Sequence, residues 1–178
     1  GLLGIYACTM LRERGVEHVF CADPVPQRRV LAQRFGAEPM PCDTDSAAER
    51  RDRIREASSH GVDAVLELSG DRTALPEGVE HLRVGGVYLL AGMVHPDSDL
   101  GGVTGEQIIR KCLTLRGVHN YSPHHLEEGI AFLERTADRF PYADLVSPPV
   151  PLSRFEEALE LSARRRWLRV AVTPKESA

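Results

Sequence analysis

The sequence is short of aromatic residues, of cysteine and of long apolar runs. Aromatic residues make up only 6% of its 178 residues, so we expect a core built mostly of Leu, Val and Ala. The four cysteines, Cys8, Cys21, Cys42 and Cys112, include no C-x-x-C pair and no spacing typical of a metal clamp. Free thiols in a reducing cytosol are therefore expected. No uncharged apolar stretch approaches the roughly 18 residues of a membrane span, so no membrane association is expected.

The chain also lacks a strong excess of one charge and the features of a secretion signal. Its 22 basic and 26 acidic residues are well mixed and give a net charge of −4, which indicates neither a nucleic-acid face nor a membrane-binding patch. The sequence does not start with a basic segment and a cleavage site, so we predict a cytoplasmic protein. No Gly/Ser-rich linker divides the chain, and residues 1–178 are expected to form one domain.

Short apolar segments alternate with longer amphipathic ones, which is the pattern of an α/β protein with a parallel sheet. Strands are predicted at residues 18–22, 38–41, 62–68, 85–92, 112–118 and 168–172. Helices are predicted at residues 2–14, 26–35, 47–58, 105–111 and 124–139. Another helix is expected to be interrupted at Pro76 before it continues to Leu82. Ser153 and Glu156 have the spacing of a capping box, which predicts the start of the last helix.

Two glycines and one aspartate near the start of the chain have the spacing of a dinucleotide-binding turn. The stretch Gly1-Leu2-Leu3-Gly4 opens a predicted helix, and Asp23 follows the next predicted strand. In the G-x-G-x-x-G fingerprint the second glycine admits the pyrophosphate, the third lets the helix pack closely, and an acid about 20 residues on binds the ribose. The helix N-terminus holds the phosphate through its free N–H groups. Gly1 and Gly4 would be the second and third glycines, with the first glycine and its strand upstream of residue 1.

Several segments, in this order, resemble the coenzyme-binding half of the zinc-type medium-chain alcohol dehydrogenases, which include sorbitol and threonine dehydrogenases. They are GLLGIYA, HVFCADPVPQRRVLAQRFGAE, VDAVLELSG, RVGGVYLLAGM, LTLRGVHNY, VPLSRFEEALEL and RWLRVAV. Their order and spacing carry the resemblance over nearly the whole chain. The stretch HNYSPHHLEEGIAFL is similar to a subgroup associated with phosphonate breakdown. The resemblance implies an α/β fold of the Rossmann type, a doubly wound parallel sheet that lacks its first strand.

The resemblance also implies which residues bind the cofactor, NAD. Asp23 would bind the adenosine ribose and select NAD, because a carboxylate repels the 2′-phosphate of NADP. Arg28 would flank the adenine, although it could equally be a solvated helix charge, and Arg169 could equally be a charge at a strand edge. The further positions implied are Gly1, Leu2, Leu3, Gly4 and Arg169 around the pyrophosphate, Ser69 and Gly70 beside the cofactor, Ala91, Gly92 and Met93 at the nicotinamide, and Val118 and His119 near the carboxamide.

The chemistry of this family needs a catalytic zinc, which polarises the alcohol oxygen so that hydride can pass to the nicotinamide. The resemblance places the zinc ligands in an N-terminal domain, and we interpret His124 and His125 as surface residues rather than as ligands. The chain is thus interpreted as a C-terminal fragment of an NAD-dependent alcohol dehydrogenase, inactive alone, with a small alcohol as substrate and a homo-oligomer when intact. Residues 145–178 are implied to return toward the missing catalytic domain.

Three other protein classes share parts of this pattern. A short-chain dehydrogenase would carry a Tyr-x-x-x-Lys pair, and none of the four tyrosines is followed four positions on by lysine. A methyltransferase also places an acid after its second strand, but the strand pattern that continues to Val172 disfavours it. A non-catalytic dinucleotide-sensing module stays open, because the sequence holds no catalytic residues of its own.

Overall fold

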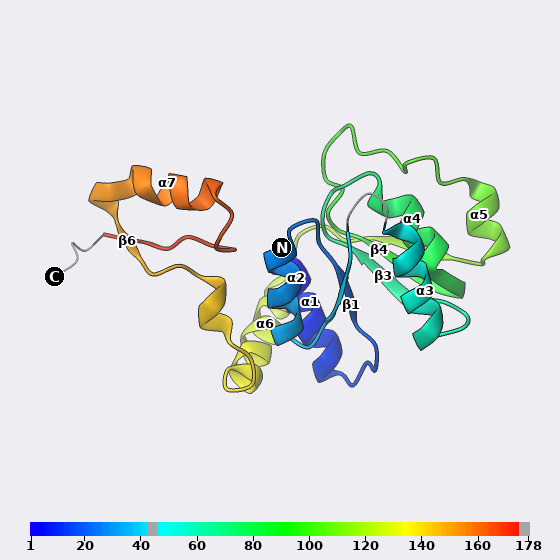
Figure 1. The fold of residues 1–178 in the computed structure, drawn as a ribbon, viewed down its shortest axis with the longest axis horizontal. Coiled ribbons are helices and arrows are strands. Elements are labelled where there is room, and N and C mark those ends of the chain that lie inside the picture. The colour runs from blue at the N-terminus through cyan, green and yellow to red at the C-terminus, as the bar shows by residue number, and fades with distance from the viewer. Residues whose placement is uncertain (43–45, 175–178) are drawn as a thin grey trace. The chain divides into compact units, whose positions relative to one another are not determined.

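The computed structural model describes residues 1–42 and 46–174, in which helices alternate with strands (Figure 1). The chain divides into two compact units, Gly1–Pro39 with Pro123–Ala178, and Met40–Ser122. We describe each unit by itself, and the prediction of one domain over the whole chain stays a prediction. None of the described helices is long and apolar enough to cross a lipid bilayer.

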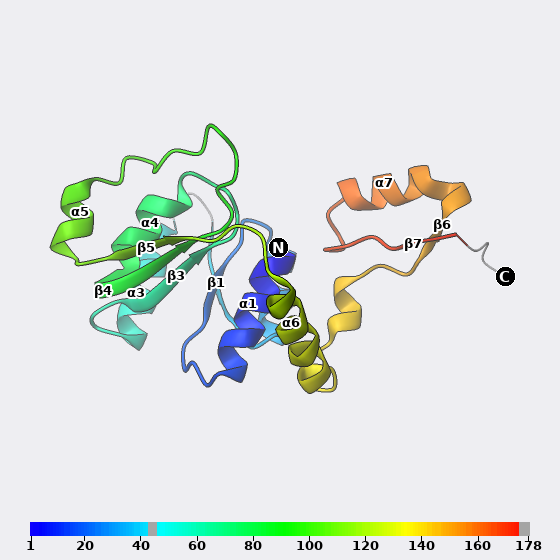
Figure 2. The same ribbon diagram turned by 180° about the vertical axis from the view of Figure 1, so that it is seen from behind.

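The first unit combines the start and the end of the sequence. Its helices are α1 (Leu2–Glu13), α2 (Pro26–Arg34), α6 (Pro123–Thr136) and α7 (Phe155–Ala163), and its 3-10 turns are η1 (Tyr142–Leu145) and η2 (Leu152–Arg154). Its strands are β1 (Phe20–Ala22), β6 (Val150–Pro151), β7 (Val172–Thr173) and β2 (Glu38–Met40), the last of which ends at the unit boundary. Helix α1 contacts both α2 and β1. Helix α6 lies beside α1 (Figure 2), where Arg135 Nε is 3.0 Å from Glu13 Oε1. The core of this unit is formed by Ile5, Cys8, Val19, Ala32, Phe35, Ala37 and Leu145.

The second unit is built on a parallel sheet. Its elements are α3 (Ala47–Ala57), β3 (Val62–Glu67), α4 (Ala74–His81), β4 (Leu82–Leu90), α5 (Gly105–Arg110) and β5 (Thr114–Gly117). The strand order is β3-β4-β5, and the register places Val65, Tyr88 and Leu115 side by side. These three residues therefore share one face of the sheet, where they pack with Leu75 and Val79 of α4. Helices α3 and α4 lie on the same side of this sheet (Figures 1 and 2).

An α/β fold with parallel strands is confirmed, but the sheet is not continuous. Among the strands that the structure describes, β1 pairs with β2, β3-β4-β5 form a second sheet, and β6 pairs with β7. The pairs within β3-β4-β5 and between β6 and β7 are parallel. Each sheet edge that lacks a partner leaves backbone N–H and C=O groups without ladder hydrogen bonds.

Three predictions at element boundaries are wrong. Helix α4 is not broken at Pro76, because this proline lies in the first turn, where a backbone N–H has no intrahelical acceptor in any case. The predicted strand at 85–92 begins earlier, at Leu82, and passes through Gly85 at a φ of +74°. The strand predicted at 168–172 is reduced to β7 and an isolated bridge between Val146 and Arg169.

The last helix begins one residue later than the predicted capping box places it. Helix α7 begins at Phe155 after the turn η2, and its N-cap is Arg154, which makes no side-chain capping bond. A capping box occurs instead at the start of α5, where Thr104 and Gln107 each bond the backbone of the other.

Candidate functional site

The residues predicted to bind the cofactor fall into two groups, one in each unit. The first group surrounds the start of α1 and the end of β1, and the second follows the carboxyl ends of β3, β4 and β5. In open α/β sheets, the carboxyl ends of the strands are where ligands bind. We therefore describe the polar contacts of each group in turn.

Asp23 is the centre of the first group. It directly follows β1 and is 7% exposed, which is rare for a carboxylate. Its Oδ1 accepts a hydrogen bond of 2.9 Å from the backbone N–H of Val25, and its Oδ2 pairs with the N-terminal amino group of Gly1 at 2.8 Å. Pro26 then starts α2, for which the fixed φ of proline is favourable. The structure thus places Asp23 directly after β1, a strand that α1 contacts.

Two arginines of α2 approach the same aspartate. Arg29 Nη1 donates a hydrogen bond of 2.6 Å to the backbone oxygen of Asp23. Arg28 Nη1 lies 4.0 Å from Asp23 Oδ2, and its Nε is buried without a hydrogen-bond partner. A buried donor without an acceptor costs about 1–3 kcal/mol. Arg28 therefore holds an unused hydrogen-bond donor next to the Asp23 carboxylate.

The first turn of α1 offers further donors. The first hydrogen bond within this helix runs from the N–H of Ile5 to the oxygen of Gly1, at 3.1 Å. The N–H groups of Leu2, Leu3 and Gly4 therefore precede the helical ladder. A Cβ atom at Gly4 would meet no heavy atom within 4 Å, so no described residue requires a glycine there for close packing.

Arg169 stands apart from this group in its contacts. Its side chain is exposed, and its Nη1 donates a hydrogen bond of 2.9 Å to the oxygen of Leu168. Its backbone N–H donates to the oxygen of Leu145 at 3.1 Å. The structure gives Arg169 no polar contact with Asp23 or Arg28, so its assignment to the pyrophosphate stays a prediction.

In the second group, two glycines bring the ends of β3 and β4 into contact. Gly70 has a φ of +76°, and a Cβ added to it would lie 2.8 Å from the oxygen of Gly92. A Cβ at Gly92 would lie 2.5 Å from the nitrogen of Gly70. The oxygen of Glu67 accepts hydrogen bonds of 3.0 Å from the N–H groups of both Ala91 and Gly92. Glycine is therefore required at both positions by space, and at Gly70 by backbone conformation as well.

Glu67 belongs to this group but was not among the predicted residues. It is 3% exposed, and its Oε1 accepts hydrogen bonds from Ser69 N at 2.6 Å, Ser69 Oγ at 2.7 Å and Gly70 N at 2.7 Å. Its Oε2 is buried without a hydrogen-bond partner. The signal in the sequence is a single acid near the end of the apolar strand VDAVLEL. Glu67 sets the path of the chain through Ser69 and Gly70.

The remaining members of the second group present mostly backbone. Val118 donates its N–H to the oxygen of Leu90 at 2.9 Å and is 40% exposed, and His119 is exposed as well. Met93 is partly buried and packs against the core of this unit. These residues carry no cluster of catalytic side chains.

No metal centre is formed by the residues that the structure describes. Among residues 1–42 and 46–174, no group of three or more His, Cys, Asp or Glu side chains could hold a metal ion. His124 Nε2 lies 3.5 Å from Glu128 Oε1, and the rings of His124 and His125 are 6.1 Å apart. These residues do not form the zinc site that dehydrogenase chemistry needs.

The two groups share one property that points to a ligand. In the described part of the chain, the two buried side-chain polar atoms without a hydrogen-bond partner are Arg28 Nε and Glu67 Oε2. One lies in each group: Arg28 is in the first turn of α2, and Glu67 is the last residue of β3. Buried polar atoms are nearly always hydrogen-bonded in native proteins, and exceptions often mark a binding site. Each group by itself thus holds one buried polar atom to which a polar ligand could bond.

Comparison with known proteins identifies the family. Residues 3–135 match the zinc-binding dehydrogenase family, and the chain therefore belongs to it. The chain is 25% identical to an L-threonine 3-dehydrogenase from Caldanaerobacter subterraneus over 98% of its length, and 28% identical to the 5-exo-hydroxycamphor dehydrogenase of Pseudomonas putida over 90%. It spans about half of these relatives, 49% and 45% of their lengths. The family predicted from the sequence is confirmed.

Solved structures lead to the same family. An alcohol dehydrogenase from Thermotoga maritima matches with a TM-score of 0.86 and 29% identity, over 97% of this chain and 48% of that chain. The 2R,3R-butanediol dehydrogenase of Bacillus subtilis matches with a TM-score of 0.79 over 98% of this chain and 49% of that one. Its identity of 20% supports the fold alone. The chain thus has the fold of the corresponding half of these dehydrogenases.

Proposed function

We propose that this chain is the NAD-binding portion of a zinc-dependent alcohol dehydrogenase. The whole protein would transfer hydride between a small alcohol and NAD, and the chain alone would be inactive. The observation that carries the proposal is the buried carboxylate of Asp23, which directly follows β1, together with the first turn of α1, a helix that contacts β1 and whose N–H groups at Leu2, Leu3 and Gly4 precede its hydrogen-bond ladder. A carboxylate and a helix N-terminus at one point are what the ribose and pyrophosphate of a dinucleotide require.

The first group would bind the adenosine half of the cofactor. The Asp23 carboxylate would accept hydrogen bonds from the ribose hydroxyls, and it would repel the additional 2′-phosphate of NADP. The N–H groups of Leu2, Leu3 and Gly4 would face the pyrophosphate, where the positive end of the helix dipole favours negative charge. Arg28 would flank the adenine, which gives its unpaired Nε–H a place to find an acceptor.

The second group would bind the nicotinamide half. The contact between Gly70 and Gly92 leaves backbone rather than side chains at this edge of the sheet. Backbone groups of residues 91–93 and 118–119 would orient the nicotinamide ring, and Glu67 would hold the Ser69–Gly70 turn in place. Bound NAD supplies the acceptor for the hydride. Zinc does not fit the described residues of this chain, so they take part in the reaction only by holding and orienting the dinucleotide.

We also propose that the α/β fold of the chain is, more specifically, the doubly wound sheet of dinucleotide-binding domains. In that order, a strand beyond those described would pair with both β1 and β3. Two observations support it: the sheets of the chain are separate, and the chain spans about half of its relatives. A homo-oligomer and a cytoplasmic location of the whole protein are proposed on the family resemblance alone.

Calorimetric titration of NAD and of NADP tests the function. We expect the chain, or the longer protein if the chain is a part of one, to bind NAD in preference to NADP. Asp23→Ala should remove the preference, whereas Asp138→Ala, an exposed acid of the same unit, should keep it. If neither NAD nor NADP binds, the proposal is overturned. Binding of NAD by a whole protein that oxidises no alcohol would favour the dinucleotide-sensing module instead.

A further inference from the structure

A cavity of about 210 Å³ lies within the Met40–Ser122 unit, where residues of α3, of the end of α4 and of the start of β4 line it. Two of these residues, Ile54 and Leu82, are apolar and almost fully buried. Gly61 directly precedes β3 and Leu82 begins β4, so the cavity lies at the amino ends of these strands. The second group of candidate residues follows the carboxyl ends of the same strands, and the cavity is therefore separate from it.

Two arginines with free side chains line this cavity, although the chain as a whole has a net charge of −4. Arg51 and Arg55 are four residues apart on α3, so they lie on the same face of this helix, and both are exposed. Within residues 1–42 and 46–174, the side chain of neither makes a hydrogen bond or an ion pair. Like charges at this spacing repel each other. An anion at the cavity would relieve this repulsion and would find unused donors on both guanidinium groups.

Lys111 adds a third positive charge to the lining. Its Nζ donates hydrogen bonds of 2.8, 2.9 and 2.9 Å to the backbone oxygens of Val79, Glu80 and Leu82, where α4 ends. Carbonyl groups at the end of a helix carry partial negative charge, which would otherwise oppose an anion. Among the described residues that line the cavity, the three cations outnumber the single carboxylate, that of Glu80. The cavity is therefore suited to a negatively charged ligand.

The size and the lining of the cavity restrict the class of ligand. Pockets for drug-sized ligands measure about 300–1,000 Å³, so this smaller cavity suits a compound of few carbon atoms and not a dinucleotide. A guanidinium group matches two oxygen atoms of a phosphate group with two parallel N–H···O bonds. Ser59 and His60, which are exposed and line the same cavity, supply further hydrogen-bonding groups. The apolar side chains of Ile54 and Leu82 offer a surface to a short carbon chain.

We propose that this cavity binds a small phosphate monoester. Arg51 and Arg55 hold the phosphate group through charge-assisted hydrogen bonds, and the carbon chain lies against Ile54 and Leu82. Lys111 strengthens the attraction through its charge alone, because its described hydrogen bonds go to the end of α4. The site does not rest on the proposed binding of NAD, since it shares no residue with either group of candidate residues.

Calorimetric titration with n-propyl phosphate tests the site, with inorganic phosphate and 1-propanol as probes that each lack one part of the ligand. We expect n-propyl phosphate to bind, inorganic phosphate to bind more weakly, and 1-propanol not to bind. Arg51→Gln/Arg55→Gln should weaken the binding of n-propyl phosphate by about tenfold or more, because the hydrogen bonds of two charged groups are lost. Arg110→Gln/Arg116→Gln is the matched control, since it removes the same charge from exposed positions of this unit that do not line the cavity. It should change the affinity by less than about twofold, because distant exposed charges are screened by salt.

Hydrogen exchange followed by mass spectrometry locates the bound compound. With n-propyl phosphate, exchange should slow in peptides that cover residues 51–61 and 80–84, and this protection should be absent from Arg51→Gln/Arg55→Gln. Slower exchange at the start of α1 instead would assign the phosphate to the predicted pyrophosphate site and would overturn the proposal.

Two further results would also overturn the site. One is no binding of n-propyl phosphate by a chain that circular dichroism shows to be folded. The other is equal affinity of the unmodified chain and of a folded Arg51→Gln/Arg55→Gln variant. A titration with NAD is a separate readout. If NAD does not bind while n-propyl phosphate does, the proposed function fails and the phosphate site stands.

Discussion

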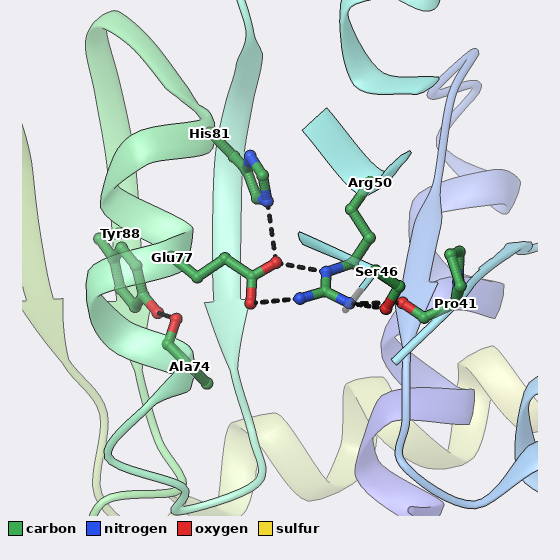
Figure 3. Close-up of polar contacts among 7 residues, drawn as sticks. All are labelled: Pro41, Ser46, Arg50, Ala74, Glu77, His81 and Tyr88. Atoms are coloured by element: carbon green, nitrogen blue, oxygen red, sulfur yellow. Dashed lines mark hydrogen bonds and ion pairs between the residues drawn. The ribbon is translucent and has the colours of Figure 1, made fainter. Parts of the chain in front are cut away.

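Arg50 on α3 donates two hydrogen bonds to the carboxylate of Glu77 on α4, one from Nε and one from Nη2, the latter of 2.9 Å (Figure 3). The same guanidinium donates from Nη1 to the oxygen of Pro41 at 2.8 Å and to Ser46 Oγ at 2.6 Å. His81 Nε2 lies 3.2 Å from Glu77 Oε1. Arg50 is only 8% exposed, so its charge depends on these partners. The pair joins two helices that pack on one side of the β3-β4-β5 sheet.

Glu77→Gln should destabilise the chain by about 1–3 kcal/mol, because it removes the negative charge that faces a nearly buried guanidinium. Urea unfolding followed by circular dichroism measures the change. Glu49→Gln is the matched control, since Glu49 is exposed on α3 and its substitution should change the free energy of unfolding by less than about 0.5 kcal/mol. Equal effects of the two substitutions would show that the ion pair adds nothing to stability.

The same pair predicts a dependence of stability on pH. Burial acts to raise the pKa of Glu77, but the hydrogen bonds and charges of Arg50 and His81 outweigh it and hold the pKa below its ordinary value of 4.5. The unfolded chain therefore binds this proton at a higher pH than the folded chain does. The stabilisation is fully present above about pH 4.5 and is lost as the pH falls through the lower pKa of the folded state.

Urea midpoints measured from neutral to acidic pH test this dependence. The difference in midpoint between the unmodified chain and Glu77→Gln should shrink as the solution becomes acidic. Other carboxyl groups with a lowered pKa contribute equally to the pH dependence of both chains, so their contribution cancels in the difference. One of them is Asp71, whose pKa is lowered by hydrogen bonds from Thr73. A difference that stays constant down to acid denaturation would contradict the prediction.

Gly92→Ala should destabilise the chain by about 1–3 kcal/mol, the usual effect of overpacking. The added Cβ would lie 2.5 Å from the nitrogen of Gly70 and 2.7 Å from the carbonyl carbon of Leu68, and backbone atoms cannot move aside as a flexible side chain can. Gly105→Ala is the control, because a Cβ there meets nothing within 4 Å. Thermal unfolding should show a lower midpoint for Gly92→Ala and an unchanged or slightly higher one for Gly105→Ala.

Glu67 allows a test of the turn that follows β3. Glu67→Leu should cost about 1–3 kcal/mol, because the N–H groups of Ser69 and Gly70 lose their acceptor. Glu67→Gln keeps one oxygen that can accept the same bonds, so it should cost less than Glu67→Leu. Chemical unfolding of both variants gives the comparison. If Glu67→Gln is as harmful as Glu67→Leu, the charge of Glu67 rather than its hydrogen bonds holds the turn.

The parts of the fold that the sequence predicts are those set by local pattern. The apolar run of Val62–Glu67 and the proline at the start of Pro26–Arg34 are visible in the sequence, and the structure places a strand and a helix there. The ion pair of Arg50 could not be predicted in this way. The stretch ERRDRIRE holds several arginines, and only the packing of α4 determines which of them is buried and paired. Glu67 was missed for a related reason, since a carboxylate inside a strand gains its role from the turn that folds back on it.

In the candidate site, too, local features could be predicted from the sequence and long-range contacts could not. The place of Asp23 directly after β1 could be predicted, because the lengths of the helix and the strand before it are local properties. The contact of Gly70 with Gly92 joins the ends of two strands, and a single sequence does not show how closely such ends approach. Arg169 was placed by resemblance, and its contacts depend on the pairing of residues 145–147 with 168–171, which is long-range.

Arg28→Met should separate a binding role from a structural one. Met keeps much of the apolar stem but removes the buried Nε donor that has no partner, so the free energy of unfolding should stay unchanged or rise slightly. If Arg28 flanks a bound adenine, NAD affinity should fall by roughly tenfold, the loss of one hydrogen bond made by a charged group. Urea unfolding gives the free energy of unfolding, and calorimetry on the same protein gives the NAD affinity.

Arg34→Met is the control. Arg34 lies at the end of α2 and pairs with Asp144 at 2.6 Å, so its substitution should leave the NAD affinity unchanged. A loss of stability with Arg28→Met and no change in NAD affinity would make this arginine a structural residue and remove it from the candidate site.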